Sequence, residues 1–147
     1  MNLPVRQSGV SMIEVLVTIA VIGFGFLSLL SLQIATLNTL SANNQNYVAV
    51  SLANGMGERL RANRDNAAFY NGMATADFDK DCSGGNCNMV EFDVWQWKQS
   101  LVGEGQLPDG AGVVAVLGGL ATVTIEWTEK RARNETERKS YVLEVPL

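Results

Sequence analysis

A long apolar stretch that carries no charged side chain follows residue 14 of the chain. Val15 to Leu32 contains only Thr18, Ser28 and Ser31 as polar residues, and no Asp, Glu, Lys or Arg occurs between Glu14 and Glu58. A helix that crosses the hydrocarbon core of a bilayer needs about 20 predominantly apolar residues. The pattern therefore predicts a transmembrane helix. Arg6 and the amino terminus lie before it, which predicts a cytoplasmic N-terminus and a periplasmic remainder.

Beyond this span the apolar residues recur at helical spacing. Steps of three, four and seven separate several of them, which is typical of an amphipathic helix with one buried stripe: Leu37, Leu40, Tyr47, Val48, Leu52, Met56 and Leu60. The run of Asn and Gln at 43–46, together with Gly55 and Gly57, weakens the helical signal. We expect one helix over residues 10–62, with a bend near Asn43.

After residue 62 the pattern changes to that of a small α+β module, residues 63–147. Asn88 is a candidate cap for a helix whose apolar face is Val90, Val94, Trp97 and Leu101. Glycines at 103–112 predict a loop, and strands are expected at 113–117, 121–128 and 141–145. The charged residues 129–139 are expected in a hairpin loop. These elements predict a small antiparallel sheet packed against the long helix.

Composition excludes several functional classes. The 147 residues include 11 basic and 15 acidic side chains, a net charge of -4, so no basic surface for a nucleic acid is expected. The chain has no histidine, the commonest general base and zinc ligand. The Gly-rich segments lack the strand–loop–helix context of a nucleotide site. We therefore expect a protein that is not an enzyme and has no catalytic, cofactor-binding or metal-binding residues.

The two cysteines, Cys82 and Cys87, enclose a short Ser-Gly-Gly-Asn segment. On the periplasmic side of a membrane they are expected to form a disulfide, since that compartment is oxidising. A redox-active pair would favour Cys-x-x-Cys spacing. The alternating acids at 77, 79 and 81 suggest a calcium loop. That loop needs Gly and Glu where Cys82 and Asn88 stand.

Glu14 is out of place between Ile13 and Val15 at the start of the apolar run. A carboxylate costs up to about 3 kcal/mol at a bilayer centre and less near the interface. One interpretation leaves Glu14 solvated at the headgroup level. In another, cleavage after Gly9 gives Val10 a free amine one helical turn away, and the amine of a neighbouring subunit pairs with Glu14. A secretory signal peptide would be cut after the apolar run, where no small-residue pattern occurs.

The segment from Gly9 to Glu14, GVSMIE, followed by Val-Leu-Val, resembles the class III signal of type IV prepilins and pseudopilins. The resemblance implies that residues 1–9 are a leader peptide removed by a prepilin peptidase. Gly9 would be the cleavage residue and Val10 the N-methylated new terminus. Glu14 would be the glutamate used in subunit docking.

A second resemblance lies at the end of the predicted long helix. The run from Glu58 to Asn63, ERLRAN, is similar to that of the PilV group of minor pilins, the type IV pilus modification proteins. Arg59 and Arg61 also suit a helix C-terminus electrostatically. The resemblance implies a pilin-like fold and a place in a minor-pilin complex that primes pilus assembly.

The same resemblance implies a set of partners and a location. The partners would be other minor pilins, the major pilin, the prepilin peptidase, the inner-membrane assembly platform and a tip adhesin. The subunit would start in the inner membrane with a single span and end in the pilus. Two alternatives stay open, a minor pseudopilin of a type II secretion system and a membrane-anchored periplasmic enzyme or sensor. The lack of histidine argues against the second.

Overall fold

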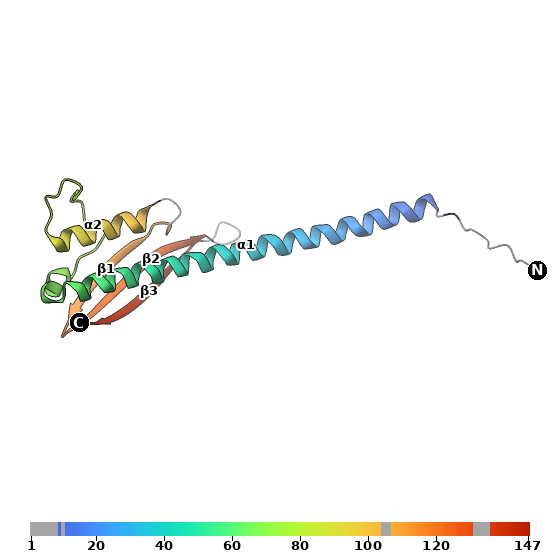
Figure 1. The fold of residues 1–147 in the computed structure, drawn as a ribbon. Coiled ribbons are helices and arrows are strands. Elements are labelled where there is room, and N and C mark those ends of the chain that lie inside the picture. The colour runs from blue at the N-terminus through green and yellow to red at the C-terminus, as the bar shows by residue number, and fades with distance from the viewer. Residues whose placement is uncertain (1–8, 10, 104–106, 131–135) are drawn as a thin grey trace, which may run out of the picture. The chain divides into compact units, whose positions relative to one another are not determined.

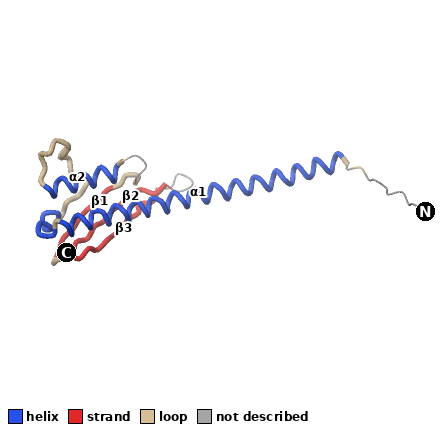
Figure 2. Tube along the Cα trace, in the orientation of Figure 1, coloured by secondary structure: helices blue, strands red, loops and turns tan. Residues whose placement is uncertain are grey.

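The computed structural model describes residue 9 and residues 11–103, 107–130 and 136–147. The elements, in chain order, are helix α1 (Met12–Ala62), a 3-10 helix η1 (Arg64–Tyr70), helix α2 (Met89–Val102) and strands β1 (Ala111–Leu117), β2 (Leu120–Lys130) and β3 (Thr136–Pro146) (Figures 1 and 2). The chain divides within α1 into two compact units, one ending at Thr39 and one running from Leu40 to Leu147. This arrangement confirms the expected α+β, pilin-like fold.

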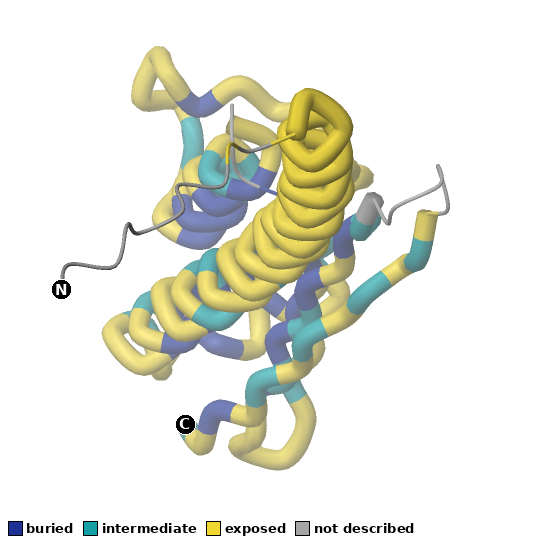
Figure 3. Tube along the Cα trace, turned by 90° about the vertical axis from the view of Figure 1, so that its right-hand side faces the viewer, coloured by how far each residue is buried: buried dark blue, intermediate teal, exposed yellow. Residues whose placement is uncertain are grey.

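In the first unit every described residue of the helix is exposed, as the yellow tube in Figure 3 shows. Large apolar side chains from Met12 to Leu37 keep 46–85% of their surface accessible. A helix that is apolar on every side is not stable alone in water, because a helix at a protein surface normally buries its apolar stripe. Something other than the described part of this chain must cover it.

In the second unit α1 packs through its small residues. Ala49, Ala53 and Gly57 recur at steps of four and are buried with Met56 and Leu60. A Cβ added at Gly57 would lie 3.1 Å from Cγ2 of Val145, so glycine lets the helix approach β3 closely.

The expected stripe on α1 is thus partly wrong. Leu37, Leu40 and Tyr47 are exposed, Val48 and Leu52 are half-buried, and only Met56 and Leu60 are fully buried. The prediction assigned the buried stripe to large apolar side chains. A helix that lies close against a sheet instead needs small residues at the contact. The helix also continues through residues 43–46 without a break.

Helix α2 and the second half of α1 form one helical layer, and both pack on the same face of the sheet. Its expected apolar face is confirmed, since Val90, Val94, Trp97 and Leu101 are all buried. A Cβ at Gly112 would fall 2.2 Å from Cη2 of Trp97, so that glycine makes room for the indole. Gly112 is therefore a strand residue with a packing role, where the sequence predicted a loop.

The sheet is antiparallel with strand order β1-β2-β3. Leu117 pairs with Leu120 around a tight turn at Gly118 and Gly119, both with positive φ. As expected, one face is apolar: Ala121, Val123, Ile125 and Trp127 of β2 are buried, and Tyr141, Leu143 and Val145 of β3 share that face.

The expected loop at 129–139 is largely wrong. Glu129 pairs with Glu137 and Lys130 with Thr136 across β2 and β3, so strand pairing extends further than predicted. Charged side chains are compatible with this part of the ribbon because Lys139 lies 2.9 Å from Glu137 and 3.8 Å from Glu129. Residues 131–135 of the expected loop lie outside the described residues.

Candidate functional site

The predicted processing and docking residues gather at the start of α1. Gly9 and Ser11 are exposed and precede the helix, which begins at Met12. The carbonyl of Ser11 accepts the amides of Glu14 (3.0 Å) and Val15 (3.3 Å). A chain segment outside regular structure is the kind of site that a protease can enter. Val10, predicted as the methylated terminus, lies outside the described residues.

Glu14 stands in the first turn of α1 and is exposed. A carboxylate there is favoured by the positive end of the helix dipole. Within the described part of the chain no cation forms an ion pair with Glu14. Its exposed carboxylate is therefore available to a group from outside.

The first half of α1 satisfies its own polar groups. The hydroxyls of Thr18, Ser28, Ser31, Thr36 and Thr39 each donate to a backbone carbonyl three or four residues earlier, at 2.8–3.2 Å. Inside hydrocarbon every polar group must find such an internal partner. The helix is long and apolar enough to cross a membrane, and none of its most apolar window is buried by the protein.

A buried polar network joins the end of α1 to η1 and α2. Nη1 of Arg59 lies 3.1 Å from Oδ1 of Asp93, whose side chain is only 6% exposed. The other carboxylate oxygen accepts the hydroxyl of Tyr70 at 2.6 Å. Burial and the bond to Asp93 raise the pKa of Tyr70 to about 12. Both oxygens of the buried Asp93 carboxylate thus have a hydrogen-bond donor, which a buried charge requires.

This network accounts for much of the ERLRAN run. Arg59 holds Asp93, Leu60 is fully buried, and Nδ2 of Asn63 donates to the Tyr70 hydroxyl at 3.1 Å. Arg61 instead pairs with Glu58 on the surface. Complementing the helix dipole is therefore not the main role of Arg59.

Sequence reasoning did not assign Asp93 or Tyr70 to this network. The usable signal was that Asp93 falls three residues after Val90 and one before Val94, on the apolar face of α2. A carboxylate on a buried face needs a cationic or hydrogen-bonding partner.

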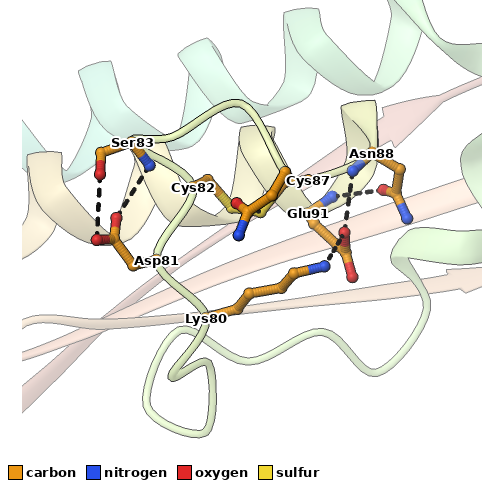
Figure 4. Close-up of a disulfide and its surroundings, with 8 residues drawn as sticks. Lys80, Asp81, Cys82, Ser83, Cys87, Asn88 and Glu91 are labelled. Atoms are coloured by element: carbon orange, nitrogen blue, oxygen red, sulfur yellow. Dashed lines mark hydrogen bonds and ion pairs between the residues drawn. A yellow bond between two sulfur atoms is a disulfide. The ribbon is translucent and has the colours of Figure 1, made fainter.

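The predicted disulfide is present between Cys82 and Cys87, with the sulfurs bonded at 1.99 Å (Figure 4). Cys82 is buried, and Cys87 directly precedes Asn88, the N-cap of α2. The bond therefore ties the start of α2 to a residue fixed in the protein interior.

The helix start next to this disulfide is held by a capping box. The Asn88 side chain accepts the Glu91 amide, and the Glu91 carboxylate accepts the Asn88 amide, both at 2.9 Å. Nζ of Lys80 reaches the same carboxylate at 2.7 Å. Lys80 and the Asn88 amide lower the pKa of Glu91. Figure 4 shows these groups converging beside the sulfurs.

The alternating acids do not converge on one point. Asp81 accepts the amide and hydroxyl of Ser83, which lowers the pKa of Asp81, and Asp79 lies 3.8 Å from Lys98. Within the described ranges, no group of three or more Asp, Glu, Cys or His side chains is placed to hold a metal ion.

Comparison with known proteins gives no relative from which a function could be transferred. The chain matches no protein-family model, and no curated protein or solved structure is significantly similar to it.

Proposed function

We propose that this chain is a minor pilin of the PilV kind, which joins a complex that primes assembly of a type IV pilus. One observation carries the proposal. The prepilin-like Gly9 and Ser11 are exposed and lie outside regular secondary structure, before a helix that has Glu14 in its first turn and exposes its whole apolar first half. A helix of this kind suits storage in a bilayer and later packing among other subunit helices.

In this proposal the inner-membrane peptidase cuts after Gly9 and methylates Val10. The new positive terminus of one subunit then pairs with Glu14 of its neighbour. Exposed ion pairs contribute little, whereas a pair shielded from water is strongly orientation-dependent. Glu14 would therefore set the axial position of each subunit in the helical bundle.

Assembly rather than catalysis is favoured by the chemistry of the chain. It has no histidine, and the buried titratable groups that we find, Asp93 and Tyr70, are occupied in holding elements together. The ERLRAN run, whose Arg59 and Asn63 serve that network, supports the pilus over a secretion pseudopilus.

Glu14→Ala tests the docking role. The variant should insert into the membrane normally but enter filaments at a level reduced roughly tenfold or more, because a shielded ion pair is lost. Immunoblots of sheared pili and of the membrane fraction measure both quantities. Glu58→Ala, at the far end of the charge-free stretch, is the matched control. Normal incorporation of the Glu14 variant would refute the proposal.

Deletion of the gene separates the two assembly systems. A minor pilin predicts loss of surface pili and of twitching motility, with protein export intact. Loss of exoprotein export with normal pili would instead assign the chain to a type II secretion pseudopilus.

A further inference from the structure

The two edges of the sheet differ in their backbone hydrogen bonding. The edge of β1 is closed by the segment that follows η1. Val114 donates to the carbonyl of Met73 and accepts the Gly72 amide. The Gly112 amide donates to the hydroxyl of Thr75, and the Gly112 carbonyl accepts the Thr75 amide. Val116 donates to the Asn71 side chain. The outward-facing amides of β1 are thus occupied.

The edge of β3 is open along the strand. Backbone groups in an antiparallel sheet alternate in direction. Since Val114 and Gly112 face outward on β1, the register places the amides of Val123 and Ile125 toward β3, bonded to Leu143 and Tyr141. The intervening β3 residues therefore point their amides and carbonyls outward: Arg138, Ser140, Val142 and Glu144. No bond between these backbone groups and any other described residue is present.

Such an edge is normally blunted or paired, because unpaired amides are a template for another strand. The side chains of the same four residues lie on the solvent face, opposite the helices. Along this edge Arg138 carries a positive charge, Val142 is half-exposed and Glu144 carries a negative charge. Arg138 makes an exposed ion pair with Glu126, and Glu144 has no ionic partner among the described residues.

We infer that the outer edge of β3 binds an extended segment of a different protein chain, running antiparallel, with an acidic residue opposite Arg138 and a basic residue opposite Glu144. Main-chain bonds would supply the affinity and the two charges the register, as in β-strand addition generally. This surface is independent of the docking role proposed for Glu14.

A second copy of this chain would match the charges of the β3 edge, but its helix would run in the opposite direction. Two β3 strands related by a two-fold axis at Tyr141 would set Arg138 against Glu144 twice. The segment of α1 from residue 40 to 62 lies on this sheet, so the axis would reverse it in one copy. In a bundle of subunit helices these segments run in the same direction, so a second copy does not fit this edge, a step that rests on the proposed function. The closed edge of β1 also prevents copies from extending the sheet in one direction.

Because the charges of β3 are self-complementary, a peptide with the sequence of β3 can be used to probe this edge. A labelled peptide with the sequence of residues 136–145, TERKSYVLEV, places Glu opposite Arg138 and Arg opposite Glu144 when it pairs antiparallel. We expect it to bind the full chain in detergent micelles, as measured by fluorescence anisotropy. A peptide with its Arg and second Glu exchanged has the same composition but opposes like charges, and should bind roughly fivefold more weakly.

Three variants of β3 locate the site. Val142→Pro removes an outward amide that the β2–β3 ladder does not use and should abolish binding, while Val142→Thr keeps the amide and should bind normally. Arg138→Glu with Glu144→Arg should reverse the preference between the two peptides. Circular dichroism verifies that each variant is folded.

Failure of both peptides to bind, or equal binding of the two, would overturn the inference. A full chain that sediments as a dimer in micelles, and becomes a monomer on Val142→Pro, would overturn it in favour of a second copy. None of these results depends on N-terminal processing, so the inference and the proposed function can fail separately.

Discussion

Asp93 is a buried carboxylate with two donors from other elements, Arg59 at the end of α1 and Tyr70 at the end of η1. Only Asn63 separates α1 from η1, whereas residues 71–88 separate η1 from α2, so the carboxylate links elements that are distant in the chain. Removing Asp93 leaves the Tyr70 hydroxyl without its acceptor and Arg59 without its ion-pair partner, which costs more than the pair itself contributes.

Asp93→Ala should therefore lower the free energy of unfolding by about 3 kcal/mol. Denaturant unfolding followed by the fluorescence of the buried Trp97 and Trp127 measures this change. Arg61→Met is the matched control in the same run of sequence, because the Arg61–Glu58 pair is exposed and its loss should cost under about 0.5 kcal/mol. Equal effects of the two variants would contradict a special role for Asp93.

Tyr70 predicts a stability change at alkaline pH. The folded chain raises its pKa from 10.0 to about 12, so the folded state binds the phenolic proton more tightly than the unfolded state does. This contribution is fully present below pH 10 and is lost as the pH rises toward 12. Tyr70→Phe should remove that loss and cost about 1 kcal/mol at neutral pH. Unfolding midpoints measured from pH 8 to 12 test it; an identical alkaline profile in both proteins would argue against it.

At the scale of elements, the contact between α1 and the sheet depends on small residues. Gly57 is buried against Val145 and Leu143, whereas Gly55 on the same helix has no neighbouring atom within 4 Å of an added Cβ. The two glycines therefore make a matched pair in which helix propensity is equal and packing differs.

Gly57→Leu should destabilise the protein by about 1–3 kcal/mol, since the added side chain would force the helix away from β3. Gly55→Leu, the matched control, should stabilise it by about 0.5–1 kcal/mol, because leucine is a better helix former than glycine and the space around Gly55 is open. Thermal unfolding by circular dichroism at 222 nm measures both changes. A Gly57→Leu protein as stable as the parent would show that the close approach is unimportant.

The disulfide fixes the N-terminus of α2 through Cys87 and the capping residue Asn88. Replacing both cysteines with serine should cost roughly 2 kcal/mol, as expected for so short a closed loop. Hydrogen exchange should accelerate at the first turn of α2, while the sheet stays protected. Unchanged exchange at that turn would show that Asn88, Glu91 and Lys80 suffice to hold it.

Element types were predictable where one physical signal dominated. The Asn88 cap and the spacing of Val90, Val94 and Trp97 predicted α2, and strict alternation predicted the buried face of β2. Packing partners were not predictable. Nothing local in the sequence says that Ala49 and Ala53 rather than Tyr47 face the sheet, that Gly112 makes room for Trp97, or that Asp93 meets Arg59. Those facts depend on contacts between residues far apart in the chain.

At the scale of the whole molecule, the chain combines a module that buries its own core with a helix that buries almost nothing. The core cluster gathers residues from α1, η1, α2 and all three strands. The first half of α1 instead presents apolar side chains outward and satisfies its hydroxyls internally. A bilayer and then a bundle of subunit helices would supply the cover that it lacks.

The mass of the N-terminus is the most direct test of the proposed cleavage after Gly9 and methylation of Val10. Trypsin finds no Lys or Arg between Arg6 and Arg59, so intact-protein fragmentation is the suitable method. In cells that contain a prepilin peptidase, the account predicts a chain that begins with N-methylated Val10, and in cells without the peptidase a chain that retains residues 1–9. A chain that keeps Met1 in the presence of an active peptidase would contradict the account.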